Sequence, residues 1–106
     1  KAVVRPVVHS TLNVEEVGVE LSHRLLQTVN RVGRADSRLA KDRKLGGLEV
    51  FKCKFRSEDI LKFARSHCIS SHKCREGDYG DERVLLRERR THKFYFLNGS
   101  DIEDHQ

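Results

Sequence analysis

The feature that most constrains the fold is a pair of short apolar segments separated by a basic cluster. Residues 84–86 are Val-Leu-Leu and residues 94–97 are Phe-Tyr-Phe-Leu, whereas residues 83–93 hold five basic side chains and one acidic one. Apolar segments belong in a core and clustered arginines do not. Two short strands of a curved sheet meet both demands, because one side can close a core while the other faces solvent or a ligand. We therefore expect strands over residues 83–90 and 93–97.

A third strand is indicated by LEVFKCKF, residues 48–55, which follows a pair of glycines. Its side chains alternate, with Phe51, Cys53 and Phe55 on one side and Val50, Lys52 and Lys54 on the other. This alternation is typical of a half-buried strand. A helix is predicted over residues 58–67, with Ser57 as its N-cap, two acids in its first turn and one apolar face.

The first third of the chain is less clearly patterned. Residues 2–9 are rich in β-branched side chains, which favour a strand, and Pro6 there marks an edge or a bulge. Residues 14–32 fit both a helical repeat and a strand alternation. Because Gly18 and several valines weaken a helix, we favour a strand over residues 16–22 and leave 23–31 open.

A chain of 106 residues suits one domain, and we treat 1–106 as a single domain. Residues 33–47 are polar, basic and bounded by glycines, so we expect a long exposed loop there. The resulting order is three strands, a helix and two strands. We expect a small α+β or mostly β fold; the alternative is an open α+β sandwich with a long first helix.

Positive charge is concentrated in two regions. The formal net charge is +5 and the sequence pI is about 9.4, and residues 31–54 alone hold eight basic and three acidic side chains. Clustered positive charge attracts polyanions, of which nucleic acid is the usual one. We expect phosphate contacts from basic side chains and base stacking from one tyrosine. The candidate residues are Arg34, Arg38, Lys41, Arg43, Lys44, Lys52, Lys54, Arg87, Arg89, Arg90, Lys93 and Tyr95.

Several local features resemble OB-fold domains of the single-strand-binding class. Gly77-Asp78 precedes the strand-like segment 83–87, Lys93-Phe94-Tyr95-Phe96-Leu97 is an aromatic final strand, and residues 29–34 are similar to the opening of a first strand. The ending 92–96 looks most like the editosome OB proteins of kinetoplastid mitochondria, which bind RNA and one another. The resemblance implies a five-stranded OB-like barrel with one helix between the third and fourth strands.

Other kinds of chemistry have weaker support. Cys68, His72 and Cys74 could ligate zinc, but their spacing fits no familiar finger, and we expect no metal and no cofactor. No nucleophile elbow, phosphate-binding loop or H-E-x-x-H motif is present, so we expect no enzymatic activity. No apolar run approaches the ~18 residues of a spanning helix, which predicts no membrane partner.

Three cysteines, an odd number, favour a reducing intracellular compartment, and mitochondrion and nucleus are both compatible with it. Because the chain starts at Lys1 and contains no Met, we expect an excised domain. The sequence thus predicts a nucleic-acid-binding domain, with single-stranded RNA favoured over DNA. The alternative is a protein-interaction module that docks in a larger complex through its strand edges.

Overall fold

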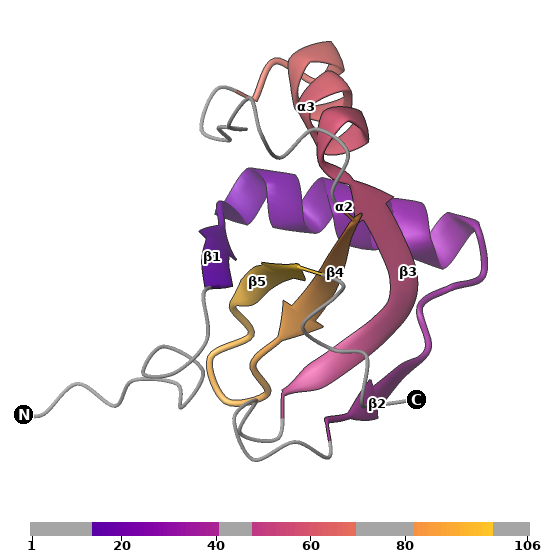
Figure 1. The fold of residues 1–106 in the computed structure, drawn as a ribbon, viewed down its shortest axis with the longest axis vertical. Coiled ribbons are helices and arrows are strands. Elements are labelled where there is room, and N and C mark those ends of the chain that lie inside the picture. The colour runs from indigo at the N-terminus through magenta and orange to yellow at the C-terminus, as the bar shows by residue number, and fades with distance from the viewer. Residues whose placement is uncertain (1–13, 41–47, 70–81, 99–106) are drawn as a thin grey trace, which may run out of the picture.

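The structure, a computed structural model, describes residues 14–40, 48–69 and 82–98 as five strands and two helices (Figure 1). The strands are β1 (Val14–Val17), β2 (Ser37–Leu39), β3 (Glu49–Arg56), β4 (Glu82–Arg87) and β5 (Phe94–Asn98). The helices are α2 (Val19–Arg31) and α3 (Ser57–Ser66). The strand expected over residues 2–9 lies outside the described residues.

All five strands form one antiparallel sheet in the order β1-β5-β4-β3-β2. The coarse prediction of a mixed α+β fold with five strands is confirmed. In the described part of the chain the sheet is open, with β1 and β2 as its two edges. Strands β2 to β5 are neighbours in chain order, which is a meander. A helix does lie between β3 and β4, but a second, longer helix lies between β1 and β2.

The strand favoured over residues 16–22 is wrong beyond Val17, because α2 begins at Val19. Leu21, Leu25 and Val29 recur every four residues and are each at most 1% exposed, whereas Val19 is 73% exposed. The helical repeat places Leu21, Leu25 and Val29 on the buried side. A strand alternation would have placed Val19 on the buried side, but Val19 is exposed. Ser22 is also buried, and its hydroxyl donates to the carbonyls of Val17 and Gly18.

Helix α2 ends in a Schellman motif that fixes where the next segment starts. Gly33 has φ of +74°, its N–H donates to the Asn30 carbonyl, and the N–H of Arg34 donates to the Val29 carbonyl. The chain then reverses and forms β2, which pairs with the start of β3. The prediction of one long loop over residues 33–47 is therefore wrong for Ser37–Leu39, and residues 41–47 lie outside the described residues.

Strand β3 and helix α3 agree with the sequence pattern except at Ser57. The helix begins at Ser57 itself after Arg56, and no side chain caps it. The predicted N-cap is therefore wrong: Ser57 is buried, and its hydroxyl accepts a hydrogen bond from Nε of Arg83 at 2.9 Å. This contact joins the start of α3 to β4 across the sheet end. Helix α3 ends at Ser66 in a second Schellman motif, with Cys68 in the left-handed conformation.

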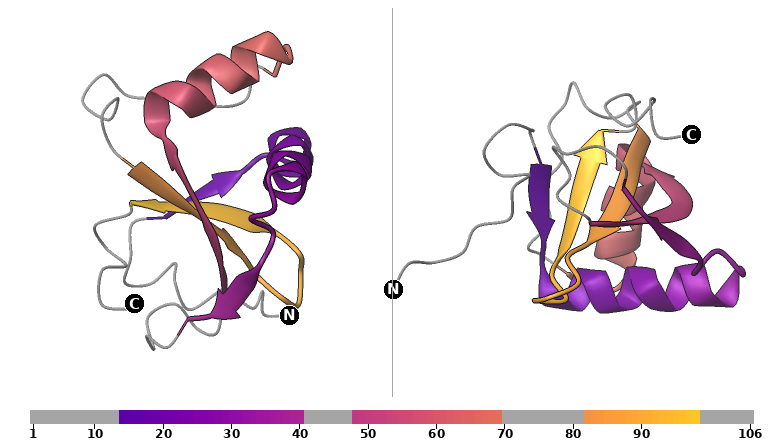
Figure 2. Two further views of the ribbon diagram at one scale, coloured as in Figure 1. Left: turned by 90° about the vertical axis from the view of Figure 1, so that its right-hand side faces the viewer. Right: turned by 90° about the horizontal axis from the view of Figure 1, so that it is seen from below.

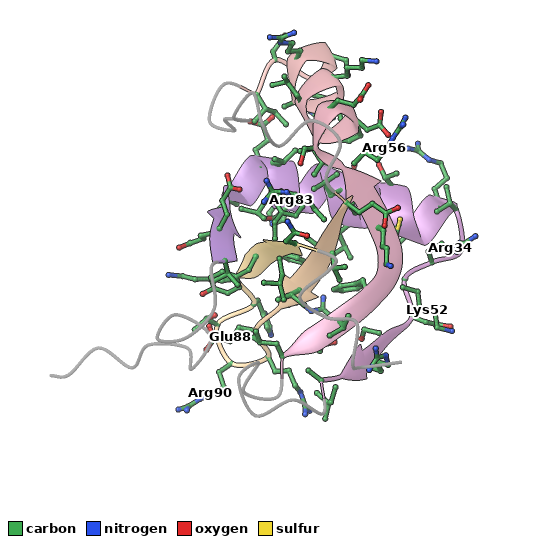
Figure 3. All side chains as sticks on the ribbon, in the orientation of Figure 1. Arg34, Lys52, Arg56, Arg83, Glu88 and Arg90 are labelled. Carbon is green, nitrogen blue, oxygen red and sulfur yellow. The ribbon has the colours of Figure 1, made fainter. Side chains whose placement is uncertain are left out.

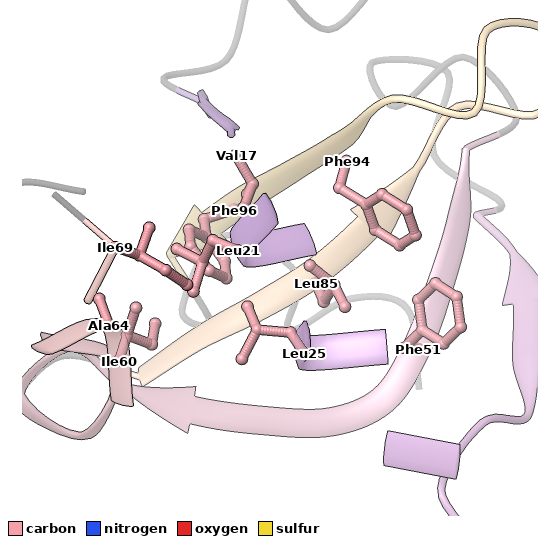
Figure 4. Packing of buried hydrophobic residues seen from close by; sticks show 10 residues of the cluster. All are labelled: Val17, Leu21, Leu25, Phe51, Ile60, Ala64, Ile69, Leu85, Phe94 and Phe96. Carbon is pink, nitrogen blue, oxygen red and sulfur yellow. The ribbon is translucent and has the colours of Figure 1, made fainter. Parts of the chain in front are cut away.

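Both helices pack on one face of the sheet (Figures 2 and 4). Leu21 and Leu25 of α2 and Ile60 and Ala64 of α3 contact apolar side chains of the strands. Each fully buried Leu or Ile contributes about 1.5–3 kcal/mol relative to an exposed one, so this layer is the main apolar core. Its buried members are Val17, Leu21, Leu25, Phe51, Ile60, Ala64, Ile69, Leu85, Phe94 and Phe96.

The opposite face of the sheet carries a second buried cluster, to which neither helix contributes. Its members are Leu48, Val50, Val84, Leu86, Tyr95 and Leu97, each at most 5% exposed. The expectation that one side of each late strand faces solvent or a ligand is therefore wrong for β4 and β5. Both faces are buried there, which explains why the two strands are continuous apolar runs rather than alternating ones.

Candidate nucleic-acid interface

The fold places Arg38 of the first basic region at the same end of the sheet as the second basic region, whereas Lys54 lies toward the opposite end, beside Glu82. The point where β2 ends and β3 begins lies at the same end of the sheet as the β4–β5 turn, because the strands are antiparallel neighbours. At the first, the Ala40 N–H donates to the Leu48 carbonyl at 2.9 Å; at the second, the Glu88 N–H donates to the Lys93 carbonyl at 2.8 Å. We call this the hairpin end. Helix α3 joins the strands at the opposite end.

The β4–β5 turn, residues 88–93, is held by its own side chains. Glu88 accepts hydrogen bonds from the hydroxyls of Thr91 at 2.9 Å and Tyr95 at 3.4 Å. The Thr91 hydroxyl oxygen accepts from the Lys93 N–H, and the His92 N–H donates to the Glu88 carbonyl. His92 takes the left-handed conformation that the turn requires, with φ of +63°. The one acid of this turn is therefore engaged within it.

Arg89 and Arg90 are exposed on this turn, and no carboxylate in the described ranges lies within ion-pair distance of either. Figure 3 shows Arg90 extending away from the body of the protein, while Glu88 lies beside the turn. Arg89 is close enough to Glu49 to help lower the pKa of that carboxyl. The turn thus presents two guanidinium groups on a fixed backbone.

Arg87, in contrast, makes hydrogen bonds and ring contacts within the protein. Its guanidinium donates to both carboxylate oxygens of Glu49, from Nε at 3.1 Å and from Nη2 at 3.0 Å. Its Cζ also lies 5.2 Å from the ring centroid of Phe51 and 5.7 Å from that of Phe94. Ser37 donates a further hydrogen bond to Glu49 at 2.9 Å. The hydrogen bonds from Arg87 hold the pKa of Glu49 below its ordinary value, with Ser37 adding to the effect.

The three lysines of the candidate set that the structure describes each lie near an acid. Lys52 pairs with Asp36 at 3.6 Å, Lys54 with Glu82 at 3.9 Å and Lys93 with Glu16 at 3.8 Å. All six side chains are about half exposed or more, so these pairs are weak and exchangeable.

Arg34 and Arg38 are also exposed, and the described residues place no acid within ion-pair distance of either. In Figure 3, Arg34 and Lys52 are both seen at the side of the sheet where β2 is. Lys41, Arg43 and Lys44 lie outside the described residues.

Tyr95 does not offer its ring to a base. It is 1% exposed within the second cluster, and burial, with the charges of Glu88 and Glu16, raises its pKa to about 12. Four of the seven aromatic residues are buried, and Phe55 and Phe63 pack against the helix-covered core. Tyr79 lies outside the described residues. The described part of the chain therefore provides guanidinium and ammonium groups for phosphate, and no exposed aromatic platform.

The cysteine and histidine residues form no metal site in the described part of the chain, where no group of three potential ligands comes together. Cys68 is exposed at the end of α3, and the His67 ring lies against the Phe63 ring in a tilted orientation. Burial raises the pKa of Cys53, with Arg34 opposing the shift, so that thiol stays protonated at neutral pH. His72 and Cys74 lie outside the described residues.

The Arg87–Glu49 pair was missed by sequence reasoning. The two residues are 38 positions apart, and only their opposition in the β3–β4 register brings them together. The one available signal was that Glu49 is the only acid in the strand-like segment 48–55. Within the described ranges, no helix is both long and apolar enough to cross a membrane.

Comparisons with known proteins identify no relative of this chain. No family model, no curated protein and no solved structure matches the chain.

Proposed function

We propose that this domain binds nucleic acid through the hairpin end of its sheet, with RNA preferred over DNA. The observation that carries the proposal is the pair Arg89 and Arg90, which are exposed on a hydrogen-bonded turn and have no carboxylate of the described residues within ion-pair distance. Arg38 lies near the end of β2 at the same end of the sheet. Guanidinium groups bind phosphate through charge-assisted hydrogen bonds.

The contacts in this proposal are made to phosphates rather than to bases. Stacking needs an exposed aromatic face, and six of the seven aromatic side chains lie in or against the cores. We therefore leave Tyr95 out of the interface, and we treat Arg87 as a structural residue. Lys52, Lys54 and Lys93 can add charge by exchanging their weak partners for phosphate. The preference for RNA rests on the sequence resemblance alone. The proposed phosphate contacts do not require the sheet to close into a barrel.

The test is fluorescence anisotropy with a labelled single-stranded RNA of ~20 nucleotides at several salt concentrations, with DNA of the same sequence and an RNA duplex alongside. Each phosphate contact to a single strand contributes about −0.7 to the slope of log K against log salt. The double variant Arg89→Gln/Arg90→Gln should therefore flatten the slope by about 1.4. Arg65→Gln is the matched control, because Arg65 is exposed on α3 at the other end of the sheet.

The outcomes separate clearly. Salt-sensitive binding that the double variant weakens and the control keeps would support the hairpin end as the interface. Absence of binding at low salt would reject nucleic-acid binding. Binding that both variants leave unchanged would reject this interface.

A further inference from the structure

Strand β3 is longer than the neighbour that covers its outer side. It spans eight residues and pairs with β4 at both its ends, from Glu49 to Arg56. On the other side, β2 has three residues and pairs only with Glu49, Val50 and Phe51. One further hydrogen bond, from the Lys52 N–H to the Asp36 carbonyl, closes this ladder at 3.3 Å. Within the described ranges, no strand pairs with the outer side of Cys53–Arg56, which we call the β3 overhang.

An uncovered strand edge presents main-chain donors and acceptors that another extended chain can satisfy. The left view of Figure 2 faces this side of the sheet, and neither helix crosses in front of β3 there. Strand β2 already shows the geometry of such pairing, since it is an antiparallel neighbour that stops after three residues. A strand added beside Cys53–Arg56 would extend the sheet edge from the point where β2 stops.

The side chains around the overhang specify the partner's charge. Lys52, Lys54 and Arg56 alternate along the strand, and their side chains are 63%, 48% and 58% exposed. Their acidic neighbours Asp36, Glu82 and Asp59 are comparably exposed, so a partner's carboxylates can replace these pairs at little cost.

Other side chains lie beside Lys52, Lys54 and Arg56 at the β3 overhang. Arg34 adds a positive charge near Cys53. Between the basic positions, Cys53 and Phe55 are half-buried, and Phe55 packs against the helix-covered core.

The same charges disfavour a second copy of this chain as the occupant. Two β3 overhangs paired antiparallel would bring lysine and arginine side chains of one copy against those of the other. Like charges directly opposite each other destabilise a strand pair. A segment with acids at alternate positions avoids this repulsion and meets three cations instead.

From this geometry we infer that the β3 overhang accepts an extended acidic segment of a partner protein as an added strand. Its glutamate or aspartate side chains would lie beside Lys52, Lys54 and Arg56, with small apolar residues between them. The inference does not depend on nucleic-acid binding: the two proposals share Lys52 and Lys54, but Arg89 and Arg90, which carry the other one, lie on the β4–β5 turn and take no part in this one.

The test uses a labelled, end-capped peptide of alternating glutamate and valine, as long as β3. Anisotropy measures its binding, and backbone amide exchange by NMR locates it. We expect binding that slows exchange at Cys53–Arg56. In the variant Lys52→Glu/Lys54→Glu, affinity for this peptide should fall about tenfold, as expected for two exposed ion pairs, and a lysine–valine peptide should bind instead. Lys62→Glu on α3 is the matched control and should change neither affinity.

A version of the acidic peptide that is N-methylated along one edge tests the main-chain bonds on the unaltered protein, so the inference does not depend on how the charge variant folds. Loss of binding on N-methylation supports strand addition. The inference would be overturned if the peptide did not bind saturably, or if N-methylation or the charge swap left its binding intact. It would also be overturned by protection from exchange elsewhere in the chain, or by dimerisation through β3. RNA affinity measured in parallel should respond to Arg89→Gln/Arg90→Gln and not to the peptide's backbone chemistry, so failure of one proposal is distinguishable from failure of the other.

Discussion

Replacing Arg87 by Ala should destabilise the fold strongly although Arg87 lies in a basic cluster. The side chain links four strands: it bonds to Glu49 of β3, which Ser37 of β2 also contacts, and it covers Phe51 of β3 and Phe94 of β5. The side chains of Arg87 and Glu49 are only 29% and 18% exposed. Solvent therefore screens this pair less than the other ion pairs of the sheet.

The magnitude follows from what the substitution removes. A hydrogen bond to a charged group contributes about 1.5–3 kcal/mol, and we take the lower end for the bidentate pair because it is partly exposed. Contact of the guanidinium with two rings adds ~0.5–1 kcal/mol. The total is about 2–2.5 kcal/mol, and each 1 kcal/mol moves the Tm of a domain of this size by roughly 4–8 °C. Arg87→Lys should recover only part of the loss, since an ammonium cannot bond bidentately.

Urea and thermal unfolding of the wild type, Arg87→Ala, Glu49→Gln and the double variant measure this directly. The double-mutant cycle should give a coupling of about 1–2 kcal/mol. The pair also predicts a pH dependence. Because the folded state lowers the pKa of Glu49, its contribution is complete above the unfolded value of ~4.3 and is lost as pH falls through the folded pKa. A loss below about 0.5 kcal/mol, typical of a surface ion pair, would refute this reasoning.

Further predictions concern the helix ends and Tyr95. Cys68→Gly should stabilise the protein by about 0.5–1 kcal/mol, because Cys68 has φ of +58° at the position that favours glycine. Gly33→Ala, at the same position of α2, should lower the free energy of unfolding by about 1 kcal/mol although there is open space for the methyl group, since Gly33 has φ of +74°. If Cys68→Gly and Gly33→Ala changed stability in the same direction, the assignment of both positions to Schellman motifs would be refuted. Stability should fall by up to about 2–3 kcal/mol as pH rises from ~10 toward 12, because the folded state keeps Tyr95 protonated after the unfolded chain has ionised. Tyrosinate absorbance in Tyr79→Phe isolates this titration, and ionisation near pH 10 would contradict it.

Sequence patterns identified the elements whose burial is decided within a few residues. In β3, Phe51 and Phe55 pack toward the helices while Lys52 and Lys54 are exposed, as their alternation predicts. Helix α3 was found within one residue at each end. The prediction for the α2 segment failed because Val17, Val19 and Leu21 fit a strand as well as a helix, and only the burial of Leu25 and Val29 in the folded protein decided between the two.

The candidate interface was divided by contacts that no local pattern reveals. Arg87 and Arg89 are two residues apart and equally basic in the sequence, yet one is bound to Glu49 and the other is exposed. Tyr95 is similarly ambiguous as an aromatic in a basic neighbourhood. Its position in β5, between strands β1 and β4, places its ring in the second cluster.

Local sequence patterns were enough to predict a sheet with at least three strands, a helix after the third of them, and positive charge concentrated in two regions. These properties depend on side-chain type and local periodicity, which are fixed before any distant contact forms. Tertiary contacts were needed to place Arg38 at the same end of the sheet as the β4–β5 turn, to pair Arg87 while Arg89 and Arg90 are exposed, and to let β3 extend past β2. The reason is that strand order and register join residues tens of positions apart, and no short-range pattern encodes which partner a strand will take.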